Sequence, residues 1–154
     1  MSAPEMKFAM APSILAAAVE RRGPYSTVGD TMRRLKEWID SKGIEQAGHP
    51  FCLYFDNPSE TPAEELRSVV CIPVAKPFNP EGETLMKRFP EVQVAETRHE
   101  GPPVEFAGTY GPFLEGLLNS GFNIVGPARE FYKTVSDVTG PGAGFLIQQP
   151  IEKK

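Results

Sequence analysis

Hydrophobic residues change their spacing along the first half of the chain in a regular order. Residues 14–21 form a mostly apolar run that stops just before Gly23-Pro24, which predicts a strand followed by a turn. The next apolar residues recur every three to four positions and end at Gly43, as in one face of an amphipathic helix. Apolar runs at residues 51–55 and 68–74 have the length and composition of strands. The first half therefore predicts a β-α-β-β unit.

The second half of the chain repeats this order at a constant offset. Gly23-Pro24 recurs as Gly101-Pro102, and Tyr54 is matched by Tyr132, 78 positions later in both cases. One offset thus aligns a turn and a strand aromatic, and it also aligns the glycines that end the two helices. Two units of this length are too few for a solenoid, so we expect a pseudo-twofold fold with one shared core.

This repeat predicts the fold class and the domain organisation. We expect a single domain over residues 1–154, with an internal repeat of residues 6–75 and 84–151. The fold class is α+β: two pseudo-twofold-related β-α-β-β units form one antiparallel sheet with two main helices packed on it. Because a proline inside a helix removes a backbone hydrogen bond, Gly111-Pro112 predicts that the second helix is kinked or begins late.

Composition and charge exclude several classes of partner. Lys and Arg number 16 against 20 Asp and Glu, a formal net charge of −4, and no basic run is dense enough to bind phosphates. No stretch approaches the roughly 18 apolar residues that a membrane span needs, and the N-terminus lacks the features of a signal peptide. We therefore expect a cytoplasmic protein without direct contact to nucleic acid or membrane.

The cysteines and histidines give no metal-binding pattern. Cys52 and Cys71 lie in apolar runs and predict buried thiols in a reducing compartment. His49 and His99 are isolated, so we expect no metal site and no cofactor. His99 aligns with Arg21 in the repeat, and we expect it at the surface end of a strand.

Six short segments form an ordered set that covers nearly the whole chain. They are residues 21–25 (RRGPY), 54–58 (YFDNP), 61–67 (TPAEELR), 98–102 (RHEGP), 126–132 (GPAREFY) and 147–151 (IQQPI). In this order and at these spacings they resemble the GyrI-like small-molecule-binding domain. That family includes the effector-binding domains of AraC-type and MerR-type multidrug regulators and the DNA gyrase inhibitory proteins.

The resemblance implies a pocket between the two units that binds bulky, flat, often cationic organic molecules. Its acidic residue falls on Glu130, and Tyr132 is two residues further along the same strand face. A carboxylate and aromatic faces both stabilise a delocalised cation. The resemblance further implies pocket aromatics, for which the candidates are Phe106, Tyr110, Phe145 and Trp38.

Two of these assignments have a purely structural alternative. From its sequence neighbours alone, Glu130 is also consistent with an outward strand residue that forms an ion pair with Arg129 or Lys133. Trp38 lies near the end of a helical apolar stripe, and such positions usually belong to the core.

The resemblance and the chain length together favour a stand-alone binding protein for small molecules. Residue 14 already lies in the first predicted strand, so we expect no DNA-binding module, and the function is sequestration or sensing of a small hydrophobic or cationic organic ligand. A protein partner is possible but nothing indicates one.

An alternative is a hydrolase of reactive cyclopropane-type compounds, with Glu130 and either Tyr110 or Tyr132 as the acid–base pair. Gyrase inhibition is a third, weaker alternative, because a net charge of −4 makes a poor mimic of DNA.

Overall fold

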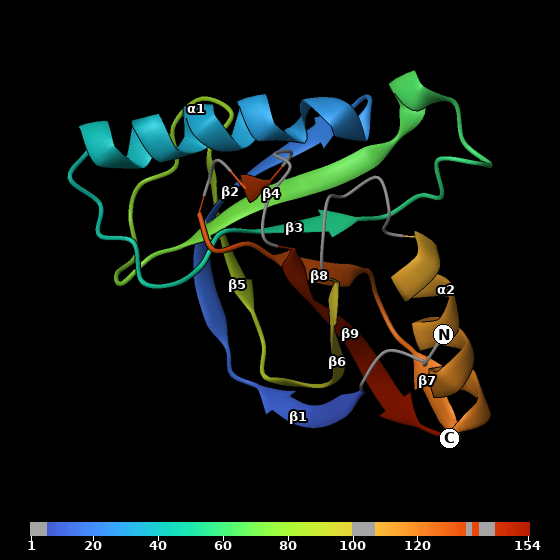
Figure 1. The fold of residues 1–154 in the computed structure, drawn as a ribbon. Helices are drawn as coiled ribbons and strands as arrows, with labels where there is room; N and C mark the ends of the chain where they lie inside the picture. The colour runs from blue at the N-terminus through green and yellow to red at the C-terminus, as the bar shows by residue number, and fades with distance from the viewer. Residues whose placement is uncertain (1–5, 100–106, 135–136, 139–143) are drawn as a thin grey trace.

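Strands make up most of the fold. The computed structural model describes residues 6–99, 107–134, 137–138 and 144–154 (Figure 1). The strands in these residues are β1 (Lys7–Ala11), β2 (Ile14–Arg22), β3 (Phe51–Tyr54), β4 (Arg67–Pro73), β5 (Leu85–Phe89), β6 (Val92–His99), β7 (Phe122–Ile124), β8 (Ala128–Phe131) and β9 (Phe145–Lys153). The α-helices are α1 (Val28–Ser41) and α2 (Ala107–Asn119), and two single 3-10 turns are Tyr25–Thr27 and Ala63–Glu65.

Two β-α-β-β units meet in the middle of one antiparallel sheet. The strand order is β1-β6-β9-β8-β3-β4-β2-β5, and β7 pairs with β9 beside this path. Strands β2, β3 and β4 with helix α1 form one unit, and strands β6, β8 and β9 with helix α2 form the other (Figure 1). The units join where β3 pairs with β8, so the order outward from this joint is the same on both sides. This is the α+β, pseudo-twofold architecture that the sequence predicts.

Both helices cover the same face of the sheet. The buried residues of α1 that pack in the core recur at helical spacing, and they are Val28, Met32, Leu35 and Ile39. Helix α2 adds Phe113 and Leu117 to the same core. One helix therefore covers each unit, and the joint between β3 and β8 lies between them (Figure 1).

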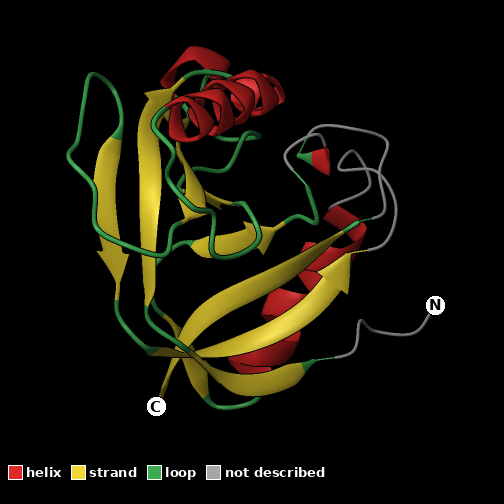
Figure 2. Cartoon of the chain, turned by 90° about the vertical axis from the view of Figure 1, so that its left-hand side faces the viewer, coloured by secondary structure: helices red, strands yellow, loops and turns green. Residues whose placement is uncertain are grey.

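The opposite face of the sheet buries its side chains by curling. The rings of Phe51 on β3 and Phe89 on β5 have centroids 5.5 Å apart, although β4 and β2 lie between the two strands. Adjacent strands are about 4.8 Å apart, so a flat sheet would hold these rings well out of contact. Phe51 also stacks on Phe131 at 4.7 Å. Figure 2 shows the resulting change of direction between the two parts of the sheet. The helices thus lie on the convex face, and a second apolar core lines the concave face.

The second helix differs from the sequence-based expectation. Helix α2 runs from Ala107 through Pro112 to Asn119, so it does not begin after the proline. Of the two predicted effects of Gly111-Pro112, the late start is wrong and the kink stays a prediction. Pro112 lies in the second turn, where it removes one backbone hydrogen bond. Its side chain is exposed, whereas the next residue, Phe113, is buried. Packing of Phe113 and Leu117 on the sheet offsets the lost hydrogen bond.

Removing the ring of Phe51 tests the curled packing. Phe51 is fully buried between two other phenylalanine rings, and we expect Phe51→Ala to lower the free energy of unfolding by about 3–5 kcal/mol. Urea denaturation measures the effect. Leu118, which is 51% exposed on α2, provides the control, because Leu118→Ala should change stability by less than about 1 kcal/mol. Equal effects of the two substitutions would contradict this packing.

Candidate functional site

Glu130 lies at the joint between the two units. It stands on β8, opposite Cys52 of β3 and Ile147 of β9. Directly opposite residues in antiparallel strands point to the same face, and Cys52 and Ile147 belong to the core beneath the helices. The side chain of Glu130 therefore points into that core, where only 7% of the residue is exposed. Carboxyl groups are rarely buried in an apolar interior unless they are paired, so the position of Glu130 is unusual.

A chain of hydroxyl groups leads to this carboxyl. The Tyr132 hydroxyl donates a hydrogen bond to Glu130 Oε1 at 2.8 Å. The Tyr54 hydroxyl lies 3.3 Å from the Tyr132 hydroxyl, so Tyr54 donates to Tyr132 in turn. The Tyr132 ring packs on Phe145 with ring centroids 5.4 Å apart. The structure therefore brings together three residues that the sequence selected, Glu130, Tyr132 and Phe145.

Burial controls the protonation of this group. It raises the pKa of Glu130 from 4.5 to about 8, and the hydrogen bond from Tyr132 opposes this rise only in part. Burial also raises the pKa values of Tyr54 and Tyr132 well above the ordinary tyrosine value. At neutral pH the unliganded site is therefore uncharged, and both tyrosine hydroxyls keep their protons.

Arg129 is not the ion-pair partner of Glu130. It lies opposite Leu53, which belongs to the core on the concave face. Successive residues of a strand point to opposite faces, so Arg129 and Glu130 point away from each other. Of the two readings of Glu130 that the sequence left open, the structure favours an inward carboxyl over an outward, ion-paired one.

Two polar residues near this site were not selected from the sequence. Thr97 on β6 pairs with Ile147 on the same sheet face, and its buried Oγ1 has no hydrogen-bond partner among the described residues. His99 is only 1% exposed, and its ring lies 4.9 Å from that of Phe145. The expected surface position of His99 is therefore wrong, because β6 continues to this residue and pairs it with Phe145. Residues 95, 97 and 99 alternate along one strand face, and the small, apolar Ala95 on that face was the sequence signal that His99 is buried.

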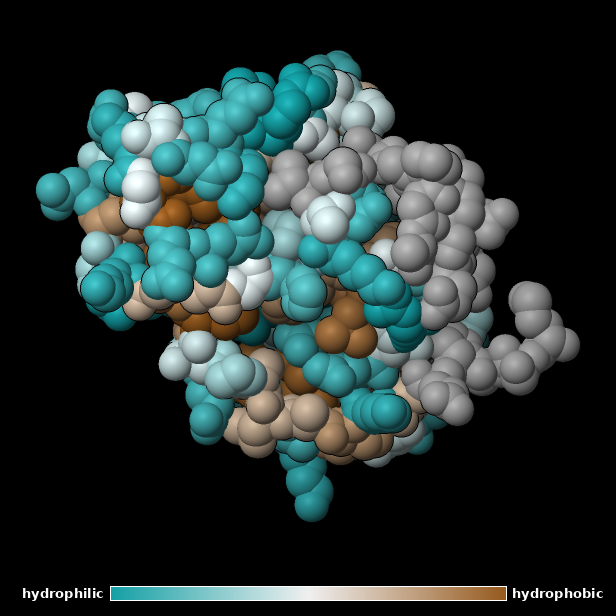
Figure 3. Space-filling model, turned by 60° about the vertical axis from the view of Figure 1, so that its left-hand side comes forward, coloured by the Kyte–Doolittle hydropathy of each residue, from teal (hydrophilic) through white to brown (hydrophobic). Residues whose placement is uncertain are grey.

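The neighbours of Trp38 differ from those of Glu130. Its ring packs edge-on against Phe78 at 5.6 Å. It lines a cavity of about 300 Å³ with Arg34 and Leu35 of α1 and with residues 81–84. Figure 3 views the molecule with the left-hand side of Figure 1 turned forward. On this face, several separate hydrophobic patches lie between hydrophilic residues. The structure thus assigns Trp38 to a cavity other than the surroundings of Glu130.

The remaining two predicted aromatics are not placed. Phe106 lies outside the described residues. Tyr110 belongs to helix α2, but its side chain also lies outside the described part of the structure.

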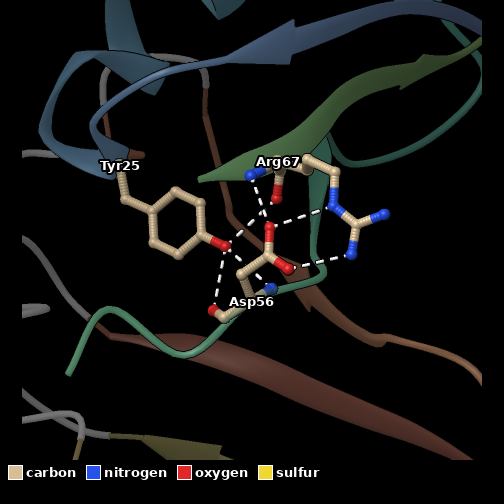
Figure 4. Close-up of polar contacts among 3 residues, drawn as sticks. All are labelled: Tyr25, Asp56 and Arg67. Atoms are coloured by element: carbon tan, nitrogen blue, oxygen red, sulfur yellow. Dashed lines mark hydrogen bonds and ion pairs between the residues drawn. The ribbon is translucent and has the colours of Figure 1, made fainter. Parts of the chain in front are cut away.

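A polar network supports the outer end of the tyrosine chain (Figure 4). The Tyr25 ring packs edge-on against Tyr54 with centroids 4.7 Å apart. The Tyr25 hydroxyl accepts from the Asp56 backbone N–H at 3.0 Å and donates to the Asp56 carbonyl at 2.9 Å. The Asp56 carboxylate accepts from Arg67 Nε at 3.1 Å and from Arg67 Nη2 at 2.8 Å. These hydrogen bonds from Arg67 hold the pKa of Asp56 below its usual value.

The described residues contain neither a metal-binding cluster nor a membrane-spanning helix. Within the described residues, no group of three or more His, Cys, Asp or Glu side chains is arranged to hold a metal ion. Cys52 and Cys71 are free, buried thiols on opposite faces of the sheet. In the same part of the chain, no helix has the length and apolar character to cross a membrane.

Known proteins share both the sequence pattern and the fold. The family model of the GyrI-like small molecule binding domain matches residues 4–141. A protein named DNA gyrase inhibitor from Escherichia coli (strain K12) is 37% identical over 102 residues, which are 62% of this chain and 63% of that protein. The match thus spans less than two thirds of this relative.

Solved structures extend the likeness to the whole fold. The crystal structure of the EcmrR C-terminal domain has a TM-score of 0.80 at 18% identity and covers 98% of this chain and 99% of that one. The structure of SAV2435 bound to tetraphenylphosphonium has a TM-score of 0.66 at 10% identity and covers 96% of this chain and 94% of that one. At these identities the comparison establishes the fold alone.

The raised pKa of Glu130 predicts a specific dependence of stability on pH. The folded protein holds a proton on Glu130 that the unfolded chain releases near pH 4.5. This contribution to stability is complete below about pH 4.5 and is lost as the pH rises through about 8. Relative to Glu130→Gln, the wild-type free energy of unfolding should fall by about 1.4 kcal/mol per pH unit across this window.

Urea denaturation at several pH values measures this difference. Glu115→Gln, on the exposed side of α2, serves as the control and should follow the wild type. Parallel pH profiles for the wild type and Glu130→Gln would show that Glu130 titrates normally.

Proposed function

The chain belongs to the GyrI-like small-molecule-binding family, and we propose that it binds amphipathic organic cations with Glu130 as their counter-ion. The observation that carries this proposal is the buried carboxyl at the joint of the two units, which has a tyrosine donor and aromatic neighbours but no cationic partner among the described residues. Sequestration or sensing of such ligands is the proposed role.

The chemistry of the site favours a delocalised cation over a small inorganic one. A compact ion loses a large hydration energy on burial, whereas a bulky organic cation loses less. Aromatic faces such as those of Tyr132 and Phe145 add about 0.5–2 kcal/mol of cation–π attraction each. The positive charge also lowers the pKa of Glu130, so the ligand and the ionised carboxylate stabilise each other. We propose Phe106 and Tyr110 as further ligand contacts and leave Trp38 outside this site.

The repeat explains why we propose one acidic residue rather than two. We take residues 1–154 as one domain with repeat units 6–75 and 84–151. Tyr54 and Tyr132 are 78 residues apart, and their hydroxyls meet at the joint. At the same offset Glu130 corresponds to Cys52, which it faces across the strand pair. The first unit thus contributes a thiol and a tyrosine, and only the second unit contributes a charge.

Binding of a fixed-charge dye at several pH values tests the proposed function. We expect rhodamine 6G to bind about tenfold more tightly for each pH unit up to about pH 8 and to show constant affinity above it, because Glu130 must release a proton. Fluorescence anisotropy measures the affinity.

Two variants complete this experiment. Glu130→Gln should weaken binding at least about tenfold at pH 8 and remove the pH dependence. Glu115→Gln should behave as the wild type. An unchanged affinity in Glu130→Gln would refute the role of Glu130 as counter-ion.

A second candidate function is hydrolysis of reactive cyclopropane-type compounds at the same site. The observation in its favour is the Glu130–Tyr132 pair, since a carboxyl with a pKa of about 8 is suited to proton transfer near neutral pH. In this candidate function Tyr132 serves as the acid, because its hydroxyl contacts Glu130. Incubation with an electrophilic cyclopropane compound, followed by mass spectrometry, distinguishes the two functions. Turnover that disappears in Glu130→Gln supports hydrolysis, and intact compound leaves binding as the function.

We do not extend the gyrase-inhibitor name of the relative to this chain. The match covers 63% of that protein. The net charge of −4 is also small for a protein that would compete with a polyanion such as DNA.

A further inference from the structure

Arg129 lies on the concave face of the sheet, on the opposite side from Glu130. It pairs with Leu53 of β3 and with Gln148 of β9. Only 5% of the residue is exposed. Its guanidinium carbon lies 5.4 Å from the ring centroid of Phe89 on β5, four strands away in the sheet order. The curl of the sheet therefore brings this cation over an aromatic face.

Within the described residues, the guanidinium group of Arg129 has no ion-pair partner. Its buried Nη1 forms no hydrogen bond to any of them. Gln148, directly opposite, uses Nε2 to donate to Glu96 at 2.7 Å and leaves its Oε1 without a partner. Burial holds the pKa of Arg129 below its ordinary value, but an arginine remains charged at neutral pH. Buried charges are almost always paired, because an unpaired one is strongly unfavourable.

The surroundings of this cation are apolar and partly open. Phe89, Phe131 and Ile14 are only partly buried, and all three pack against the core of the concave face. Phe131 stacks on the buried Phe51, so its ring is held in place. A molecule that reaches Arg129 would contact these rings.

We propose that the concave face of the sheet holds a second binding site, which takes an organic carboxylate. The carboxylate pairs with the guanidinium of Arg129, and its apolar body lies on Phe89 and Phe131. Guanidinium and carboxylate groups match in geometry and form strong charge-assisted hydrogen bonds. The phenylalanine rings favour an acid with an aromatic or aliphatic body over an inorganic anion. This site is independent of the proposed cation site, because adjacent residues of β8 direct Arg129 and Glu130 to opposite faces.

A pair of ligands that differ only in charge tests this proposal. 1-Naphthaleneacetate carries the carboxylate, and 1-naphthaleneacetamide is its neutral analogue. We expect the wild type to bind the acid at least about tenfold more tightly than the amide, as measured by isothermal titration calorimetry. Arg129→Met keeps the apolar stem and removes the charge, so it should remove this preference. Glu130→Gln should keep the preference.

Equal affinities for acid and amide in the wild type would overturn the proposal, as would a preference that persists in Arg129→Met. An NMR titration of the wild-type protein provides a second readout. Here a variant of Arg129 is needed only to assign the Arg129 signal. The Nε–H signal of Arg129 in the wild-type protein should shift on addition of the acid and stay in place with the amide. An unmoved signal at saturating acid would also overturn the proposal. If Arg129→Met does not fold, Arg129→Lys takes its place. This variant keeps the charge and should retain part of the preference for the acid.

Discussion

The pairing of β3 with β8 places Glu130 where two half-sheets and two helices exclude water, and the surrounding groups reflect the consequences of that burial. A carboxylate there would be strongly destabilised, so the group holds its proton up to about pH 8. Tyr132 provides a hydrogen bond, and Tyr54 extends that contact toward the surface network of Tyr25, Asp56 and Arg67. Without ligand the carboxyl of Glu130 is uncharged, and a bound cation would favour loss of its proton. This link between cation binding and deprotonation is the basis of the proposed function.

The two faces of β8 carry opposite chemistry because a strand alternates its side chains. Glu130 points to the convex face beneath the helices, and Arg129 points to the concave face enclosed by the curl of the sheet. Neither side chain neutralises the other, although they are neighbours in sequence. The two proposed sites, for ligands of opposite charge, thus share one short strand at the centre of the sheet.

The sequence predicted the parts of this structure that depend on local periodicity. The stripe that ends at Gly43 predicted helix α1, and the offset between Tyr54 and Tyr132 predicted a pseudo-twofold fold. That the two hydroxyls meet is a finding of the structure. Glu130 was selected from the family resemblance, since Arg129 and Lys133 alone favoured an outward residue in an ion pair.

Features that depend on contacts distant in sequence were not predictable in this way. Edge strands β1 and β5 were missed, because β1 has four exposed residues among its five and β5 is only partly buried. The burial of His99 depends on its pairing with Phe145. The contact between Arg129 and Phe89 depends on the curl of the whole sheet, which no local pattern encodes.

Titration of the Glu130 side-chain carboxyl by ¹³C NMR tests directly whether burial keeps this group protonated at neutral pH. Uniform glutamate labelling, with assignment by comparison to Glu130→Gln, isolates this signal in the free protein. We expect a titration midpoint near pH 8 without ligand and a lower midpoint with a bound organic cation. A midpoint near the ordinary value of 4.5 in the free protein would contradict it.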